Sequence, residues 1–536
     1  QKESESTEDR WYGPLGSLLV TAGISQQDIA DGKVDYMTLY GTVMMFQLGN
    51  AKAAQYYGED LVAAIQEGVS QIKDGMTTVQ KLLVLNDWLA EWSQFDMGML
   101  MGMTAPEQGK SWVPADDPDI PAEMAGNIEG LWKGNQFGPL VMKNGVCLGY
   151  SNAYTLLIQN AFPEIYKNEG GSWKTKQQLN YVKTGEEQAV DAEGNPMVDE
   201  NGDPVMVDVQ EWSPDAPYMV DYVRITYDAS VTMFGEEQDK FDSDHYWNAV
   251  KVDGKWYYVD PCYTDIYIEC MMRDRVETDG NMNHLYFMVS DSTIRKLYDE
   301  YYSGIDTLYQ NIATDTTYES SWLPFIKSPV DVVDGKYYYF YDSTDMVSML
   351  GQFGGMNGVS TQAEDGNSGW GDWQEDTDYQ LVYHDGSEAD TSKTFTTLVD
   401  FVEGTVLVDG QMVANDLIKD LYAKHQAYQE KYPSIQISGS VYNGLFYFNI
   451  ANTVCTYNLE TGEVKQILEY NEVSAKRDMT VALGGLGFNV VPNDSEDKDI
   501  TLYDKPIASM TIKNDGNMYV SVATNLGWIS GKTGMD

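Results

Sequence analysis

Apolar residues recur every three or four positions through the first third of the chain, which is the spacing of a helix with one buried face. The pattern predicts helices over residues 36–47, 54–72 and 79–92. Thr77 precedes the third segment and Gln80 stands three positions after it, an arrangement typical of a capping box. The N-terminal part of the fold is therefore expected to be helical.

The next stretch alternates between turn-rich and periodic sequence. Residues 103–135 are rich in Pro, Gly and Asp and are expected to form a long surface loop. A new helical pattern runs from Val146 to Phe162. Residues 163–240 carry two similar turn sequences. Within this stretch, we expect residues 197–209 to form a hairpin-like insertion.

A different period, that of a β-hairpin, begins at His245. Residues 245–260 alternate around the dipeptide Asp253-Gly254, which is a strong signal for a two-residue turn. Counting outward from that turn pairs His245 with Cys262. It also sets Asp260 diagonally across from His245 on the same face, about 7–8 Å away at Cα. A carboxylate is thereby expected within reach of an imidazole.

Beyond about residue 325 the chain consists of short alternating runs preceded by turn residues, as in β-strands. These runs are Asp334–Tyr341, Gly404–Val408, Asn443–Ile450, Thr456–Ile467 and Asn514–Val520. One helix is expected over 415–432, and the Gly-rich acidic stretch 351–378 is expected to be a loop. The irregular spacing favours a partial, propeller-like β domain, with a β-sandwich as the alternative.

These patterns divide the 536 residues into three expected parts. Residues 1–30 read as a flexible polar leader, of the kind left after a signal or lipid-anchor sequence is processed. Residues 31–325 form a mixed α+β domain with an insertion at about 163–240. Residues 326–536 form the β-rich domain.

The net charge of the chain limits the kinds of molecule that it can bind. The net charge is −49, from 34 basic and 83 acidic residues, so the surface repels phosphate backbones and no nucleic-acid partner is expected. No apolar run approaches the roughly 18 residues of a membrane span. The polar start favours a secreted or lipid-anchored protein outside the cytoplasm. The 38 Tyr and 13 Trp favour strands and, in the C-terminal domain, contact with protein or glycan.

Cys147, His245 and Asp260 are the candidate catalytic residues. A thiol, an imidazole and a carboxylate supply the attacker, the base and the group that orients the base in an activated nucleophile. Cys147 lies where a helix is expected to begin, and the helix dipole together with a neighbouring imidazolium favours the thiolate form. Gly145 and Gly149 allow close backbone approach on either side.

An acyl-transfer site also needs donors for the oxyanion. The backbone N–H of Cys147 is one candidate, and Gln136, Asn144 and Trp247 are candidates for the second donor. A metal site is the competing interpretation of the same groups. The four cysteines form no C-x-x-C pair and the ligand spacing of a zinc site is missing, so neither metal nor cofactor is expected.

Three segments, Asn144–Tyr154, His245–Pro261 and Asn283–Asp291, resemble the transglutaminase-like superfamily, whose motifs read roughly G-V-C-x-G-Y and H-x-W-N-x-V-x-V-D-G-x-W-Y-x-V-D-P. The resemblance implies an α+β, papain-like core in which a helix bearing Cys packs on an antiparallel sheet bearing His and Asp. The superfamily includes cross-linking transglutaminases, cysteine peptidases, peptide N-glycanases and bacterial surface proteins. The gap of 98 residues between Cys147 and His245 (245 − 147) is longer than compact members have.

The resemblance implies cysteine-dependent acyl transfer or hydrolysis of an amide, in an extracellular protein or cell-wall peptide at a bacterial cell surface. The chain departs from the family pattern at Tyr246, where Ala is common, and at Cys262-Tyr263, where Thr-Trp is common. These changes bear on substrate fit. The alternative function is a cell-surface binding protein that grips protein or glycan and uses the same domain as a non-catalytic scaffold.

Overall fold

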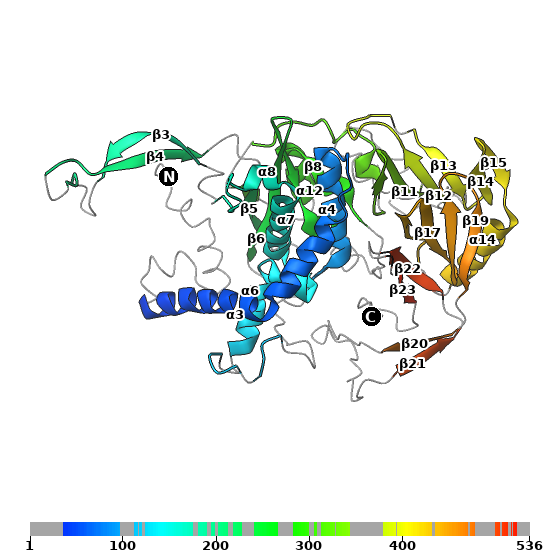
Figure 1. Ribbon diagram of the computed structural model, residues 1–536, viewed down its shortest axis with the longest axis horizontal. Coiled ribbons are helices and arrows are strands. Elements are labelled where there is room, and N and C mark those ends of the chain that lie inside the picture. The colour runs from blue at the N-terminus through cyan, green and yellow to red at the C-terminus, as the bar shows by residue number, and fades with distance from the viewer. Residues whose placement is uncertain are drawn as a thin grey trace, which may run out of the picture.

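The computed structural model describes residues 36–522 with gaps, of which the longest are 97–111, 228–240, 266–281, 343–378 and 477–498. Within that part the chain is a mixed α+β protein, with helices in the N-terminal half and antiparallel sheets toward the C-terminus (Figure 1). The expected leader at 1–30 and the expected loop at 351–378 lie outside the described residues. No described helix combines the length and apolar character needed to cross a membrane.

The N-terminal half is built on a set of helices and short helical turns. The α-helices are α3 (Tyr36–Val69), α4 (Thr78–Trp92), α6 (Ala125–Lys133), α7 (Cys147–Ala161), α8 (Pro163–Tyr166), α10 (Pro261–Thr264) and α12 (Asp291–Asp299). The shorter turns are η3 (Gly138–Met142), η4 (His284–Tyr286) and η5 (Leu323–Phe325). Helix α7 agrees with the expected helix to within one residue at each end.

Two details of these helices bear on the sequence predictions. The capping box is confirmed, because the Gln80 N–H donates to Thr77 Oγ1 at 3.1 Å and the Thr77 N–H donates to Gln80 Oε1 at 2.9 Å. The two helices expected at 36–47 and 54–72 are one helix, α3, with a kink at Tyr57 (φ −128°, ψ 16°).

The expectation of a surface loop over 103–135 is wrong for its last third, which forms helix α6. Ile128 and Trp132 stand four residues apart, so they share one face of the helix, and both are fully buried. They pack with Ala53 of α3, and the Trp132 indole N–H donates to the Gly49 carbonyl at 2.8 Å. The Pro- and Gly-rich composition of residues 103–135 outweighed this apolar pair in the prediction of a loop.

A five-stranded antiparallel sheet lies against α7, in the order β8-β7-β6-β5-β9. Its strands are β5 (Tyr218–Tyr227), β6 (Phe241–Val252), β7 (Lys255–Val259), β8 (Phe287–Val289) and β9 (Ile305–Thr307). The turn between β6 and β7 is as expected: Val252 pairs with Lys255, and Asp253 and Gly254 have φ of 50° and 77°. Two successive positive φ values are those of a type I′ turn, which suits the twist of a hairpin.

The stretch 163–240 holds more structure than the expected hairpin-like insertion at 197–209. Strands β3 (Tyr181–Gln188) and β4 (Met206–Trp212) pair as a two-stranded arm that extends away from the body of the molecule (Figure 1). The same stretch also contains β5, which pairs along its length with β6.

The C-terminal half contains two antiparallel meanders. The first is β10 (Asp331–Val333), β11 (Lys336–Asp342), β12 (Tyr379–His384), β13 (Thr396–Asp400), β14 (Thr405–Val408) and β15 (Gln411–Ala414). The second is β16 (Gly439–Tyr442), β17 (Leu445–Ile450), β18 (Thr453–Asn458) and β19 (Val464–Glu469). Two further pairs follow, β20 (Glu472–Lys476) with β21 (Asp499–Tyr503), and β22 (Ile507–Ile512) with β23 (Met518–Val522).

The two meanders share one hydrophobic cluster with helix α14 (Asp416–Gln429), to which Phe401, Phe448 and Ile418 contribute. The strand runs expected at 334–341, 404–408, 443–450 and 456–467 and the helix expected at 415–432 are therefore confirmed, apart from small shifts at their ends. No closed barrel or propeller forms among the described residues, which corrects the propeller-like expectation.

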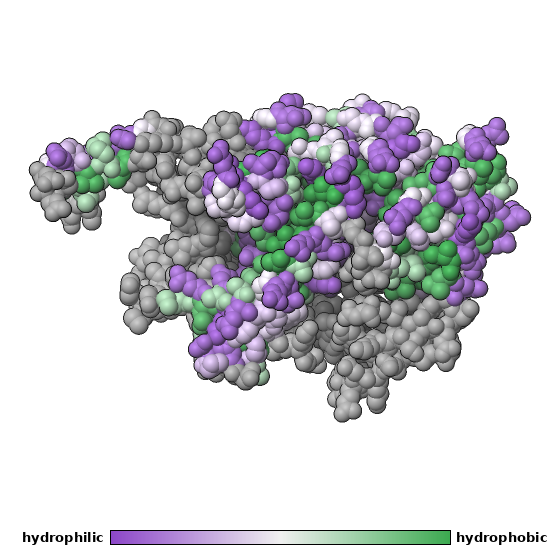
Figure 2. All heavy atoms as spheres, viewed as in Figure 1, coloured by the Kyte–Doolittle hydropathy of each residue, from purple (hydrophilic) through white to green (hydrophobic). Residues whose placement is uncertain are grey.

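The two halves are joined through a common core. Trp322, Tyr337 and Tyr339 belong to the same buried cluster as residues of α4, α7 and the five-stranded sheet. The Gln80 amide donates to the Tyr337 hydroxyl at 2.7 Å, and the Thr77 hydroxyl donates to a carboxylate oxygen of Glu388 at 2.6 Å. The N-terminal end of α4 is thereby tied to the first meander. On the face shown in Figure 2, hydrophilic residues are interspersed with apolar patches.

We predict that Trp322→Ala destabilises the protein by about 3–5 kcal/mol, the usual cost of removing a large buried aromatic side chain. Trp322 stacks on Tyr339 and packs edge-on against Tyr337, so a cavity would open between the halves. Urea unfolding followed by circular dichroism measures the loss. Met412→Ala on exposed strand β15 is the control, with an expected change within about 0.5 kcal/mol. Equal effects of the two changes would contradict a shared core.

Candidate active site

Cys147 is the first residue of α7 and is half-buried. Val146 caps the helix with extended backbone (φ −105°, ψ 175°), and its N–H donates to the Lys133 carbonyl at 3.1 Å. The thiol therefore lies at the positive end of the helix dipole, where negative charge is favoured. This is the position that the sequence predicts for the nucleophile.

The two glycines around Cys147 are required by close packing. A Cβ on Gly149 would overlap the Lys133 carbonyl oxygen, and a Cβ on Gly145 would lie 2.7 Å from the Pro139 ring. The chain between α6 and η3 therefore presses directly on the start of α7. This contact fixes how closely the start of α7, which carries the Cys147 thiol, packs against the preceding segment.

His245 lies on β6, and its Nε2 is 2.6 Å from Asp260 Oδ2. Both residues are buried, with 6% and 0% of their surface exposed. The other oxygen of Asp260 accepts the N–H groups of Cys262 and Tyr263, at 3.0 and 3.1 Å. Asp260 is thus at once the N-cap of α10 and the partner of the imidazole, and both of its oxygens are satisfied.

The predicted register is correct near the turn and wrong at the far end of the hairpin. Strand β7 ends at Val259, and Pro261 opens α10, so Cys262 does not pair across from His245. The Asp260 N–H leaves the ladder and donates to the Tyr286 carbonyl at 2.9 Å. Turning into a helix brings the Asp260 carboxylate to hydrogen-bonding distance of the ring, closer than a flat hairpin would.

The thiol and the imidazole interact. Burial lowers the pKa of His245, but the charges of Asp260 and Cys147, together with hydrogen bonds to both side chains, raise it to about 10. Since Asp260 occupies Nε2, Nδ1 is the ring nitrogen left for the sulfur. The structure therefore brings together the three residues that the sequence nominates, with His245 in the middle.

Two buried contacts that the sequence analysis missed fix α7 against the other elements. The Asn248 amide donates to the Ser151 carbonyl at 3.1 Å and to the Thr155 hydroxyl at 2.9 Å, which ties β6 to α7. The Tyr150 hydroxyl donates to Asp265 at 2.5 Å, which ties α7 to the end of α10. A polar Asn inside a strand of buried residues was the available signal, because such a group must find partners.

The candidate oxyanion donors lie in three different places. Gln136 is half-buried in the segment between α6 and η3 that presses on α7. Asn144 is half-buried on the short strand β2 (Asn144–Gly145), three residues before the thiol. Trp247 is fully buried, and its ring packs edge-on against His245, with 6.0 Å between the ring centroids.

The other two cysteines among the described residues are buried. Cys262 is fully buried, and burial, followed by the charges of Asp260 and Cys147, raises the pKa of its thiol. Burial likewise raises the pKa of Cys455 to about 12. Within the described residues, no group of three or more His, Cys, Asp or Glu side chains is arranged to hold a metal ion. Cys270 lies outside the described residues.

We predict that Gly149→Ala lowers the free energy of unfolding by about 1–3 kcal/mol, because the added methyl group must push back the Lys133 backbone. Gly130→Ala in the middle of α6 is the matched control. Nothing lies within 4 Å of that methyl position, so better helix propensity should stabilise the protein by about 0.5–1 kcal/mol. Urea denaturation compares the two variants, and a harmless Gly149→Ala would refute the close contact.

The buried His245 also predicts how stability depends on pH. Its folded pKa, about 10, lies above the ordinary value of 6.5, so its contribution is complete below pH 6.5 and is lost as pH rises toward 10. In His245→Gln the fall in unfolding free energy across that window should be smaller by at least about 1.4 kcal/mol, the equivalent of one pKa unit.

Unfolding by urea at a series of pH values tests this dependence. His425→Gln is the control: burial lowers the pKa of His425 to about 4, so this group is neutral throughout the alkaline window. The control should keep the wild-type slope. A His245→Gln slope identical to that of the wild type would show that the imidazole is not held as a cation.

Comparisons with known proteins leave this geometry without an assigned family. No protein-family model and no curated protein sequence matches the chain. A functional assignment therefore rests on the residues of the site, their distances and their burial.

Proposed function

We propose that this protein is a cysteine-dependent acyl-transfer enzyme of the transglutaminase-like class, with Cys147, His245 and Asp260 as its catalytic residues. The observation that carries the proposal is the buried 2.6 Å contact between His245 and Asp260, beside a half-buried thiol at a helix start. A helix bearing the thiol and an antiparallel sheet bearing the imidazole are also the core that the motif resemblance implies.

In the proposed reaction the Cys147 sulfur attacks the carbonyl carbon of an amide. The His245 imidazolium then donates its Nδ1 proton to the leaving amine, and a thioester remains on the sulfur. Water gives up a proton to His245 and attacks the thioester, which releases a carboxylic acid and restores the thiolate–imidazolium pair. Asp260 keeps the ring oriented and stabilises its cationic form throughout.

The negative charge that develops on the carbonyl oxygen needs preorganised donors. The backbone N–H of Cys147, at the start of α7, is one of them in this scheme. Gln136 is our choice for the second donor, because its segment presses on the first turn of α7 and its side chain is only half-buried. Asn144, three residues before the thiol, and Trp247, whose ring packs edge-on against His245, are the other candidates.

The substrate we propose is an amide in an extracellular protein or a cell-wall peptide, at a bacterial cell surface to which the chain is secreted or lipid-anchored. Hydrolysis is favoured over cross-linking, since no feature of the sequence marks a site for an acceptor amine. The C-terminal sheets would contact protein or glycan, in keeping with their many aromatic side chains. No metal or cofactor takes part in this scheme.

Alkylation by iodoacetamide, located by peptide mass spectrometry, tests the proposal. Cys147 should react at pH 6, where an ordinary thiol is mostly protonated, because the His245 cation stabilises its thiolate. His245→Ala should slow that reaction at least about tenfold, whereas His425→Ala, a buried histidine far along the chain, should not. Turnover of a peptide-amide library should fall by about 10²–10⁴ in His245→Ala.

The alternative, a surface-binding protein with a scaffold domain, makes the opposite prediction. In that case Cys147 would label at pH 6 as slowly as buried Cys262 and Cys455, and His245→Ala would change nothing. That result would refute the enzymatic proposal.

A further inference from the structure

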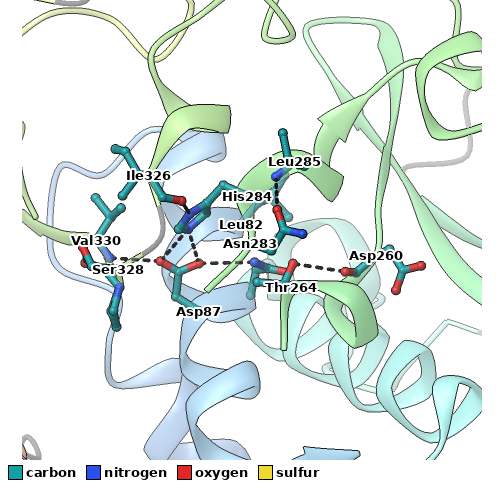
Figure 3. Close-up of polar contacts among 12 residues, drawn as sticks. Leu82, Asp87, Asp260, Thr264, Asn283, His284, Leu285, Ile326, Ser328 and Val330 are labelled. Carbon is teal, nitrogen blue, oxygen red and sulfur yellow. Dashed lines mark hydrogen bonds and ion pairs between the residues drawn. The ribbon is translucent and has the colours of Figure 1, made fainter. Parts of the chain in front are cut away.

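A second buried histidine–carboxylate pair lies behind the candidate site, between α4, the turn η4 and the segment that leads into the C-terminal sheets (Figure 3). His284 Nε2 is 3.1 and 3.2 Å from the two oxygens of Asp87. The exposed fractions of the two residues are 0% and 4%. Neither residue belongs to the catalytic set predicted from the sequence.

The pair carries charge. His284 Nδ1 is 2.7 Å from the Ile326 carbonyl, so both ring nitrogens face groups that can only accept, and both must donate. Burial lowers the pKa of His284, but the charge of Asp87 and hydrogen bonds to Asp87 and the Ile326 carbonyl raise it above its ordinary value. Asp87 also accepts the Val330 N–H at 3.1 Å. A buried ion pair that is also bonded to the Ile326 carbonyl and the Val330 N–H resists displacement.

The turn that carries His284 holds both ends of α10. The Asp260 N–H donates to the Tyr286 carbonyl at 2.9 Å, and the Asn283 N–H donates to the Thr264 carbonyl at 3.0 Å. Helix α10 has only one turn and is capped by the Asp260 carboxylate. Its position, and with it that of the carboxylate, therefore depends on where η4 lies.

A chain of side chains runs alongside these backbone bonds. Thr264 Oγ1 lies 3.1 Å from the Asp260 carbonyl and 3.3 Å from Asn86 Oδ1, and the Asn86 amide donates to Asp87 at 3.2 Å. Figure 3 shows this path from Asp260 through Thr264 toward Asp87 and His284. The contacts thus form a continuous connection from the backbone of Asp260 to residues 326–330, at the entrance to β10.

We propose that Asp87 and His284 are positioning residues for Asp260, and that through them the segment entering the C-terminal sheets sets the reactivity of Cys147. This inference rests on the proposed function of the Cys147 site. It makes the C-terminal half part of the active site's support, in addition to any binding role. It also gives the His284 turn a task other than packing.

The test is the pH profile of Cys147 alkylation in the full-length chain, compared between the wild type, His284→Gln and Thr264→Val. Loss of the ion pair should let α10 shift, weaken the Asp260–His245 contact and move the alkylation midpoint to higher pH by about one unit, a tenfold change at pH 6. Thr264→Val removes the bridging hydroxyl at nearly constant volume, so it should shift the midpoint in the same direction by a smaller amount. His425→Gln, which removes another buried histidine, should leave the midpoint unchanged.

Thermal melting identifies which variants fold. A folded His284→Gln variant with the wild-type midpoint would overturn the inference, and so would an equal shift in His425→Gln. If His284→Gln does not fold, Thr264→Val decides, and an unshifted midpoint there counts against the proposal. A wild-type Cys147 with the profile of an ordinary thiol would overturn the proposed function itself, and the inference with it. A perturbed wild type with unperturbed variants would remove the inference alone.

Discussion

The contact between His245 and Asp260 is the constraint on which the rest of the site depends. A carboxylate with no exposed surface must have each oxygen occupied, and Asp260 achieves this by two means. One oxygen meets the imidazole, and the other caps a one-turn helix. The end of β7, the start of α10 and the orientation of the imidazole ring are therefore set by a single side chain. Moving any one of them would leave a buried charge without its partners.

The Cys147 thiol is held near this pair by residues that take no part in the proposed reaction. Asn248 joins the histidine strand to α7, Tyr150 joins α7 to Asp265, and Gly149 lets the Lys133 backbone lie against the helix start. Each contact links a different pair of elements, so together they hold the thiol, the imidazole and the carboxylate in a fixed relation. Such preorganisation is what allows a weak nucleophile to act without reorganising its surroundings.

Local signals in the sequence were sufficient for the elements that carry the site. The capping box at Thr77, the helix that starts at Cys147 and the Asp253-Gly254 turn each follow from neighbouring residues. The same turn chemistry recurs at Asp334-Gly335, Asp409-Gly410 and Asn443-Gly444, where each of the first residues has a φ near 50°. This recurrence explains why the strands of the C-terminal half were also found.

What the sequence could not supply are the features decided by distant partners. The alternation through Asp260 continues past the point where the strand stops, because Pro261 and the cap of α10 decide that end. Asp87 and His284 stand 197 residues apart, and the local sequence around either residue does not indicate a contact with the other. Helix α6 was hidden because its burial comes from α3, through Trp132 and Gly49, and not from its own composition. In each case tertiary contact overrode the local signal.

The Cys147 sulfur, the His245 ring and the Asp260 carboxylate are expected to behave as one charged unit. Nitrogen-15 NMR of the imidazoles tests it directly, because the chain has only 4 histidines to assign. His245 should be protonated on both nitrogens at pH 8, and Cys147→Ala should lower the pH midpoint of its titration. A His245 ring that is neutral at pH 8 in the wild type, or that is indifferent to the loss of the Cys147 sulfur, would contradict it.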